Sequence, residues 1–350
     1  MAKVIRVLVV DDSALVRNIL SQGLSMDPNI EVVGTASDPY IARDRIVELQ
    51  PDVLTLDVEM PRMDGVAFLR KLMPQYPIPV VMVSSLTQRG KQITMDALDA
   101  GAVDFVAKPT SNVAAGLNAM LMELRAKVKI ASTANVSHWK GKRVSAQPQA
   151  SIGSKALAES TDKVIAIGAS TGGTEAIRRV VEAFPSTSPG VVIVQHMPPG
   201  FTKMFSDRLN QLCQMQVKEA EDGDRVRSGL ILVAPGGMQM KVVRSGGFYQ
   251  VRCGGAEKVS GHCPSVDVMM HSVAEHVGRN AIGAMLTGMG QDGAEGMLAM
   301  KNAGAQCIAQ DEASSVVFGM PKVAYEKGGA KRLVPLDKIA PSLLGMLTEK

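Results

Sequence analysis

The chain has 350 residues, enough for two domains that each bury a core of their own. Hydrophobic residues make up 46 % and charged residues 21 %, and the formal net charge of +4 gives no reason to expect a nucleic-acid partner. The four cysteines lie far apart without a C-x-x-C pair, so we expect free thiols rather than a zinc site.

The amino terminus predicts no signal peptide, because the apolar run over residues 4–10 is broken by Arg6 and stops at Asp11. No apolar stretch is long enough to span a bilayer. We therefore expect a cytoplasmic protein without membrane insertion.

Short apolar runs alternate with helical patterns through the first part of the chain. The predicted strands are residues 5–10, 32–36, 53–57, 80–84 and 104–106. The predicted helices are residues 13–24, 40–49, 65–73, 93–100 and 112–128. This alternation predicts an α/β domain over residues 1–125, with a doubly wound parallel sheet covered on both faces. Small and polar residues dominate after it, and residues 126–161 are interpreted as a linker.

The alternation resumes in a second predicted α/β domain over residues 162–350. Its predicted strands are residues 164–168, 191–195, 230–234, 282–287 and 306–310. Its predicted helices are residues 175–182, 201–212, 266–276, 294–303 and 317–327. Residues 238–244 and 247–252 predict an inserted antiparallel hairpin.

Polar side chains follow several strands of the first domain at the point where each strand ends. Asp11 and Asp12 follow the first strand, Asp57 ends the third, Ser84 the fourth and Lys108 the fifth. Because these strand ends share one edge of the sheet, the side chains are expected to meet there. Three carboxylates repel one another unless a hard cation such as Mg²⁺ lies among them. With Lys108 and Ser84 holding phosphoryl oxygens, Asp57 can accept a phosphoryl group covalently.

The alternative for Asp11 and Asp12 is that they only end a strand and cap the next helix. The segments VLVVDDSALVR, LTLDVEMPRMDG, VMVSS and GAVDFVAKP, however, resemble the response-regulator receiver family in order and spacing. The resemblance covers residues 1 to about 125 and implies a flavodoxin-like fold. It implies that Asp57 is the phosphoacceptor and that Lys108 contacts the phosphate. It implies that Mg²⁺ is bound by Asp12, Asp57 and the backbone carbonyl of Glu59, with Asp11 behind them. The Ser84 hydroxyl and the Phe105 ring would act as switch residues.

The segment VIAIGASTGGTEAI of the second domain predicts a strand, a tight turn and a helix. It contains Gly168-x-Ser170-x-Gly172, the spacing of a nucleophile elbow. A serine on such a turn needs small neighbours, and the helix start offers N–H groups to an oxyanion. A serine also needs a base. His196 follows the next strand at the same sheet edge and is the first candidate, with His262 in reserve.

An acid is expected to orient the histidine. Asp292 follows a strand through a loop that contains Gly288 and Gly290, and Asp311 follows the next strand as its rival. We prefer Asp292, because a loop with two glycines can bring both a carboxylate and a free N–H to the serine. The order Ser, His, Asp differs from that of the α/β-hydrolases, so the elbow resemblance is local.

Two other interpretations of the second domain are weaker. Its glycine turn could bind a dinucleotide, but the next strand closes with Gln195-His196 rather than with the acidic residue that a ribose requires. A DNA-binding output domain would be shorter, more basic and helical.

From about residue 162 onward, the segments IGASTGGTEA, QHMPPGFT, APGG, HCPSVDVMM, AMLTGMGQDGA and DEASSVVFGMP resemble the CheB methylesterase family of chemotaxis. The resemblance implies a Rossmann-like protein-glutamate methylesterase that also deamidates glutamines and needs no cofactor for ester hydrolysis. Its implied substrates are methyl-accepting chemoreceptors, and its phosphodonor is the chemotaxis histidine kinase. It assigns Ser170 as nucleophile, His196 as base, Asp292 as its orienting acid and the backbone N–H of Met289 as oxyanion donor.

The domain order suggests how activity is controlled. Our hypothesis is that the unphosphorylated receiver packs over the Ser170 cleft and that phosphorylation favours an open form. The alternatives are a receiver that only accelerates catalysis from elsewhere, and a catalytically silent second domain whose partner binding is regulated.

Overall fold

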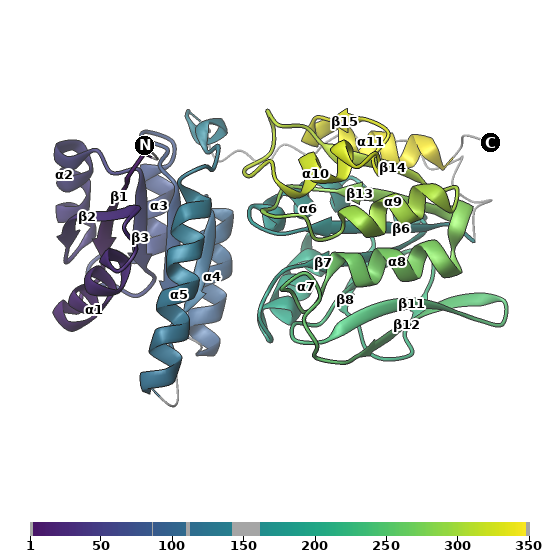
Figure 1. Cartoon of the computed structure of the whole chain (residues 1–350), viewed down its shortest axis with the longest axis horizontal. Helices are drawn as coiled ribbons and strands as arrows, with labels where there is room; N and C mark the ends of the chain where they lie inside the picture. Colours follow the sequence, from purple (N-terminus) through teal and green to yellow (C-terminus); the bar gives the residue numbers. More distant parts are fainter. Residues whose placement is uncertain (1–2, 86, 110–112, 142–161, 348–350) are drawn as a thin grey trace. The chain divides into compact units, whose positions relative to one another are not determined.

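The computed structural model of the chain describes residues 3–85, 87–109, 113–141 and 162–347. It divides into two compact units, Met1–Ser145 and Ala146–Lys350, and each is an α/β fold, as the sequence predicts (Figure 1). Within the described ranges, no helix combines the length and the apolar character needed to cross a membrane.

The first unit is built on a five-stranded, entirely parallel sheet with the order β2-β1-β3-β4-β5. Its strands are β1 (Ile5–Val10), β2 (Ile30–Ala36), β3 (Val53–Asp57), β4 (Val80–Ser84) and β5 (Asp104–Ala107). Its helices are α1 (Ala14–Ser25), α2 (Pro39–Leu49), α3 (Gly65–Leu72), α4 (Gln88–Asp99) and α5 (Val113–Ala131). This strand order is flavodoxin-like, and the expected fold is confirmed.

The winding direction of this sheet reverses between β1 and β3. Right-handed crossovers in opposite directions place α1 on one face and α2, α3 and α4 on the other. Helix α5 returns to pack beside α1. Ligands of such folds bind at the carboxyl ends of the strands where the direction reverses. The ends of β1 and β3 are therefore the expected site.

The first unit continues beyond residue 125, where the sequence placed its end. Helix α5 runs to Ala131, which is fully buried and so extends the packed face of the helix. A short 3₁₀ turn, Ser137–Trp139, follows. The Gly141 N–H donates to the Pro74 carbonyl at 2.9 Å, which holds this segment against the same unit. The rest of the predicted linker, residues 142–161, lies outside the described residues.

The second unit contains a seven-stranded parallel sheet with the order β15-β14-β13-β6-β7-β10-β8. Its strands are β6 (Val164–Ala169), β7 (Gly190–Gln195), β8 (Gln216–Glu219), β10 (Leu230–Val233), β13 (Ala281–Met285), β14 (Gln306–Gln310) and β15 (Leu333–Val334). Its helices are α6 (Gly173–Val181), α7 (Phe201–Leu212), α8 (Val266–His276), α9 (Ala294–Asn302), α10 (Met320–Glu326) and α11 (Leu336–Met346), with a 3₁₀ turn η3 (Gly278–Asn280). The doubly wound, Rossmann-like sheet is confirmed.

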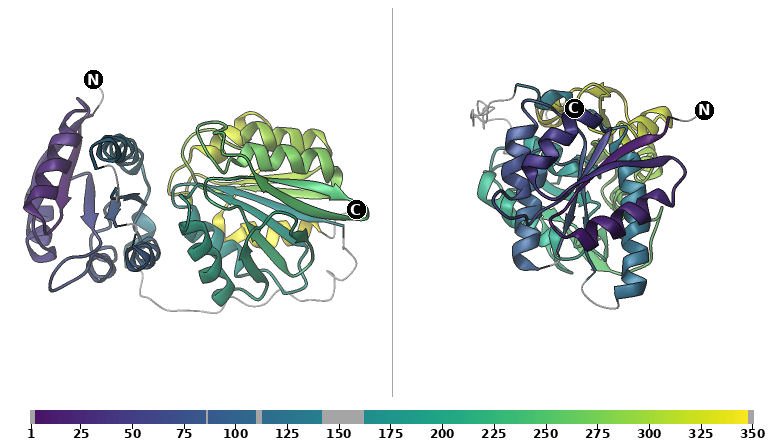
Figure 2. Two further views of the ribbon diagram at one scale, coloured as in Figure 1. Left: turned by 90° about the horizontal axis from the view of Figure 1, so that it is seen from below. Right: turned by 90° about the vertical axis from the view of Figure 1, so that its left-hand side faces the viewer.

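The predicted hairpin is also present. Strands β11 (Gln239–Ser245) and β12 (Phe248–Gly254) pair antiparallel, and β9 (Arg225–Val226) completes a small three-stranded sheet. The helices of the second unit cover both faces of its seven-stranded sheet. Helices α8 and α9 lie side by side on one face, and helices α6 and α11 lie on the other (Figure 2). The winding direction reverses between β6 and β13, so the carboxyl ends of these two strands mark the expected site.

Helix α10 starts at Met320, three residues later than the predicted start at residue 317. The preceding backbone is held elsewhere, because Phe318 bridges to Gly288 and the Gly319 N–H donates to the Gly288 carbonyl at 3.1 Å. A segment bound along the β13 loop in this way cannot take helical hydrogen bonds.

Candidate active site

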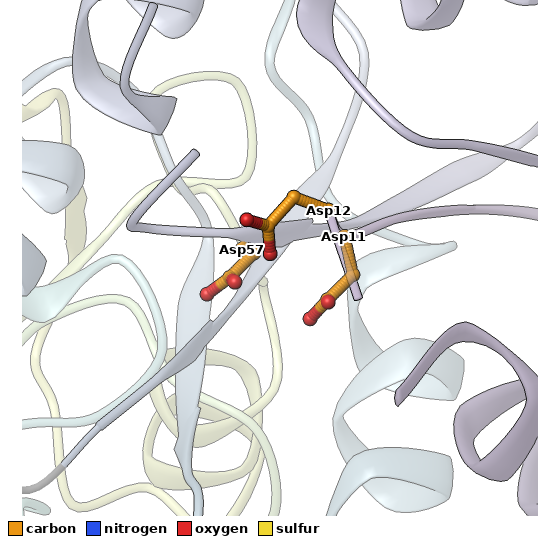
Figure 3. A group of neighbouring side chains, drawn as sticks. All are labelled: Asp11, Asp12 and Asp57. Atoms are coloured by element: carbon orange, nitrogen blue, oxygen red, sulfur yellow. The ribbon is translucent and has the colours of Figure 1, made fainter. Parts of the chain in front are cut away.

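The first unit gathers three carboxylates at the carboxyl ends of β1 and β3 (Figure 3). One oxygen from each of Asp11, Asp12 and Asp57 lies within 4.8 Å of the others. Asp11 and Asp57 are buried, whereas Asp12 is exposed. Two backbone N–H groups fix the buried pair, since Ser13 donates to Asp11 and Val58 donates to Asp57, at 2.9 and 2.8 Å.

Lys108 after β5 bridges the two buried carboxylates. Its Nζ lies 3.0 Å from Asp57 Oδ1 and 3.1 Å from Asp11 Oδ2. Burial raises the pKa of Asp57 to about 6, with the Lys108 charge opposing this shift and the Asp11 charge adding to it. Burial alone would lower the pKa of Lys108, but the charges of Asp57 and Asp11 outweigh it and raise that pKa. The site therefore holds more negative charge than one ammonium group can neutralise.

These residues fit a hard divalent cation. All three side chains offer oxygen ligands, which Mg²⁺ prefers, and one of them is open to solvent for the waters that Mg²⁺ retains. Glu59, whose carbonyl the sequence assigned to the metal, lies two residues after Asp57 in the loop that follows β3.

The two expected switch residues lie at neighbouring strands. The Ser84 hydroxyl is buried at the end of β4, where it accepts from Thr94 Oγ1 at 2.6 Å and donates to the Gly90 carbonyl at 3.2 Å. In this structure it therefore bonds to α4 rather than to Lys108. The Phe105 ring is buried on β5, with Lys127 Nζ 5.0 Å from its centre. Their proposed switching roles remain predictions.

Ser170 of the second unit occupies a turn that is fixed on both sides. Its N–H donates to the Thr287 carbonyl at 3.0 Å, and its carbonyl accepts from Gln195 Nε2 at 2.9 Å and from the Gly173 N–H at 2.7 Å. Gly172 sits at a φ of +76°, a conformation that favours glycine. The glycines of the motif thus serve a sharp strand-to-helix turn.

His196 follows β7, the strand next to β6. Ala169 and Gln195 are directly paired in register, so Ser170 and His196 leave the sheet side by side. His196 Nε2 lies 2.8 Å from Asp292 Oδ2. Its Nδ1 is buried and has no hydrogen-bond partner within the described part of the chain. The structure therefore brings His196 and Asp292 together and leaves one imidazole nitrogen available.

Asp292 lies in the loop between β13 and α9, and its side chain, 1 % exposed, reaches the N-terminus of α8. It accepts from Ser265 Oγ at 2.7 Å and from the N–H groups of Val266 and Asp267 at 2.7 and 3.2 Å. Burial alone would raise the pKa of Asp292, but the hydrogen bonds from His196, Ser265 and Val266 outweigh it and lower that pKa. The carboxylate is thus ionised and able to stabilise an imidazolium ion.

The rival acid, Asp311, has a different task. Its Oδ1 accepts from the N–H and the hydroxyl of Ser314, at 3.1 and 2.5 Å, and so closes the turn after β14. Asp292 rather than Asp311 is the partner of His196 in this structure.

The expected oxyanion donor, Met289, lies in the loop after β13. Its N–H donates to no other residue within the described ranges. The preceding residue, Gly288, is packed against the serine, because a Cβ there would lie 2.8 Å from Ser170 Cβ and 2.4 Å from Met320 Sδ. A free N–H thus follows directly after a residue in contact with Ser170.

Two contacts of this site were not expected from the sequence. Gln195, which it used only to argue against a dinucleotide, holds the Ser170 carbonyl. His262, the reserve base, stacks on His196 with a ring-centre distance of 3.7 Å and an interplanar angle of 8°. The sequence marked His262 only as the reserve candidate for the base, and nothing in it indicated that this ring would stack on His196.

The chain matches two family models, "Response regulator receiver domain" over residues 7–117 and "CheB methylesterase" over residues 165–343. A protein-glutamate methylesterase/protein-glutamine glutaminase from Syntrophotalea carbinolica is 73 % identical and covers 100 % of this chain and 99 % of its own length. A protein of the same name from Salmonella typhimurium is 52 % identical over 98 % of this chain and 97 % of its own. The crystal structure of the Thermotoga maritima CheB methylesterase catalytic domain matches with 37 % identity and a TM-score of 0.51, covering 53 % of this chain and 98 % of that one.

A receiver domain followed by a domain of this fold defines a response regulator with an enzymatic output domain. The chain belongs to the CheB methylesterase family. Its expected enzyme class, protein-glutamate methylesterase with protein-glutamine glutaminase activity, is confirmed.

Proposed function

We propose that the chain hydrolyses glutamate methyl esters on methyl-accepting chemoreceptors, and deamidates receptor glutamines, through Ser170, His196 and Asp292. The observation that carries this proposal is the His196–Asp292 hydrogen bond beside the Ser170 turn. With Nε2 facing Asp292, Nδ1 is the nitrogen that accepts the serine proton. Because the receptor glutamates in question lie on cytoplasmic helices, we place the reaction in the cytoplasm.

In the first half-reaction, Ser170 Oγ attacks the ester carbonyl while His196 takes its proton. The N–H of Met289 donates to the oxyanion of the tetrahedral intermediate. Asp292 stabilises the imidazolium ion and keeps the ring oriented. The intermediate then collapses, and His196 returns the proton to the departing methoxide, which leaves as methanol.

In the second half-reaction, His196 takes a proton from a water molecule, which attacks the acyl-enzyme. The tetrahedral intermediate then collapses, His196 returns the proton to Ser170 Oγ, and the glutamate side chain is released. A glutamine substrate passes through the same type of tetrahedral intermediate, with ammonia as the leaving group. One site can therefore serve both substrates.

A serine-directed organophosphonate tests the nucleophile without any receptor. We expect the full chain to gain one adduct mass on the peptide that contains Ser170, and Ser170→Ala to gain none. His196→Ala is expected to slow the labelling, because the serine then lacks its base. Labelling of another serine at the wild-type rate in Ser170→Ala would contradict the assignment.

Asp57 is the proposed phosphoacceptor, with the chemotaxis histidine kinase as donor. Mg²⁺ held by Asp12, Asp57 and the Glu59 carbonyl, with Asp11 behind them, would neutralise charge on the transferring phosphoryl group. Lys108, already within 3.0 Å of Asp57, would contact a phosphoryl oxygen on that side chain. Phosphorylation of Asp57 would then break the Lys108–Asp11 ion pair and reorient the Ser84 and Phe105 side chains, which would alter the surface of the receiver domain.

The unphosphorylated receiver is proposed to block the Ser170 cleft. The second unit, Ala146–Lys350, is compact by itself, so deletion of residues 1–145 gives a direct test. The blocking hypothesis predicts that the truncated enzyme is more active than the unphosphorylated full chain. Equal or lower activity would favour a receiver that accelerates catalysis from elsewhere.

A further inference from the structure

His262 lies on the loop between β12 and α8 and stacks flat against the imidazole of His196. The ring centres are 3.7 Å apart, and the ring planes differ by 8°. Imidazole N–H bonds lie in the plane of the ring, so neither ring can donate a hydrogen bond to the other in this arrangement. This geometry excludes direct proton transfer between the two rings. His262 can therefore act on His196 only through the contact between their ring faces.

The electrostatic surroundings keep His262 neutral. The titratable groups that face it are His196, Asp292 and Lys258. Burial lowers the pKa of His262 to about 4, and the charges of His196 and Lys258 lower it further against the opposing effect of Asp292. When His196 becomes an imidazolium ion during turnover, the ring beside it is therefore uncharged and offers its π face to the cation.

The backbone around His262 is firmly held. His262 and Val259 exchange two backbone hydrogen bonds of 2.9 and 3.0 Å. Gln239 Nε2 donates to the His262 carbonyl at 3.2 Å, while Gln239 Oε1 accepts from the Ser265 N–H at 2.9 Å. Ser265 Oγ in turn donates to Asp292 at 2.7 Å. One glutamine therefore connects the loop that carries His262 with the helix cap that holds the catalytic acid.

We propose that His262 is a positioning residue, whose neutral ring holds the His196 imidazole in the plane set by Asp292 and keeps water from that face. This inference rests on the proposed role of His196 as base. The sequence suggested His262 as a reserve base. The parallel stack leaves no path for a proton between the rings, so we assign His262 a positioning role instead. Its function depends on the flat aromatic face rather than on the ring nitrogens.

The test compares His262→Ala with His262→Phe in the full chain. Phe keeps a flat aromatic face but has no nitrogen, whereas Ala removes the face. Initial rates of methanol release from a methyl-esterified chemoreceptor cytoplasmic fragment give kcat and KM. His271→Ala, an exposed histidine on α8, is the matched control. Circular dichroism checks the fold of every variant, and His262→Asn replaces His262→Ala if the latter does not fold.

We expect His262→Ala to lower kcat by about tenfold to a hundredfold, the cost of a slightly misplaced catalytic group, while KM changes less than about twofold. His262→Phe restores kcat to within about threefold of the wild type, since an aromatic face again covers the ring.

An unchanged kcat in His262→Ala would overturn the inference, and so would a His262→Phe variant as slow as His262→Ala, which would show that a ring nitrogen is required. Ser170→Ala is assayed in parallel. If it retains activity, the proposed mechanism fails as a whole. If it is inactive and only the His262 variants behave like the wild type, the positioning role alone fails.

Discussion

Replacing Asp292 by asparagine tests the electrostatic design of the second site. The carboxylate accepts four hydrogen bonds: Oδ1 accepts from Ser265 and Asp267, and Oδ2 accepts from Val266 and His196. Asparagine keeps the shape of the side chain but has only one acceptor oxygen, and its amide nitrogen donates. At least one of the four donors must therefore lose its acceptor.

The two possible amide orientations have different costs. An amide nitrogen in the place of Oδ2 leaves the Val266 N–H without a partner and forces His196 to carry its proton on Nδ1, the nitrogen that must accept the serine proton. An amide nitrogen in the place of Oδ1 can donate to the Ser265 hydroxyl but leaves the Asp267 N–H without a partner. Either orientation lowers the free energy of unfolding by about 1–3 kcal/mol, the cost of one unsatisfied buried donor. Loss of the negative charge at the N-terminus of α8 removes a further ~0.3–1 kcal/mol.

The effect on turnover is larger than the effect on stability. Asp292→Asn removes the charge that stabilises the imidazolium ion in both orientations and fixes the unproductive tautomer in one of them, so kcat should fall by roughly 10²–10⁴-fold. The assay is methanol release, with urea unfolding to measure stability. The matched control is Asp311→Asn, which alters a carboxylate after the neighbouring strand and should leave kcat within about threefold of the wild type. A folded Asp292→Asn enzyme with near wild-type kcat would refute this reasoning.

Gly288→Ala places a Cβ 2.8 Å from Ser170 Cβ, so kcat should fall by at least about tenfold, whereas Gly254→Ala, with no atom within 4 Å of its added Cβ, should match the wild type in the same methanol assay. Between pH 6.5 and about 4 the unfolded chain binds a proton on His262 that the folded chain does not, so urea unfolding should show stability decreasing as the pH falls through this window. This component is at most about 3 kcal/mol and should be missing in His262→Phe; an identical pH dependence in both proteins would contradict the buried neutral histidine. Lys108→Ala, or removal of Mg²⁺ by a chelator, should abolish the rise in methanol release caused by a small phosphodonor, and persistence of that rise would argue against the phosphate site at β1 and β3.

Residues at strand ends were the part of both sites that the sequence could predict. Buried parallel strands are continuous apolar runs, and the first polar residue after each run lies at one edge of the sheet. Asp57, Lys108 and His196 were expected at these edges because each follows a strand, and Ser170 was expected there from the spacing Gly168-x-Ser170-x-Gly172. These placements could be predicted because they depend on hydrophobic patterning, which is local in the sequence.

Residues placed by long-range hydrogen bonds could not be predicted in this way. The stack of His262 on His196 depends on Gln239, more than twenty residues away on the hairpin. Asp292 was preferred over Asp311 from the two glycines of its loop, but its place at the cap of α8, where Ser265 donates to the carboxylate, was not predicted. Such contacts leave no periodic pattern in the sequence, because each joins segments far apart in the chain whose positions are set by the rest of the fold.

The existence and the lengths of peripheral elements were also difficult to predict. The two-residue edge strand β15 and helix α11, which contains Pro341, lack the apolar runs that marked the central strands. Helix α5 extends past its predicted end because further residues, such as Ala131, find a buried position on the first unit. Packing rather than local propensity decides these boundaries.

Methanol release from a methyl-esterified chemoreceptor cytoplasmic fragment measures both the proposed chemistry at Ser170 and its control by Asp57. The wild type, Ser170→Ala and Asp57→Ala are compared, each with and without a small phosphodonor and Mg²⁺. We expect release by the wild type that rises with phosphodonor, no release by Ser170→Ala under either condition, and release by Asp57→Ala that does not respond to phosphodonor. Release by Ser170→Ala at the wild-type rate, or a full response to phosphodonor in Asp57→Ala, would contradict it.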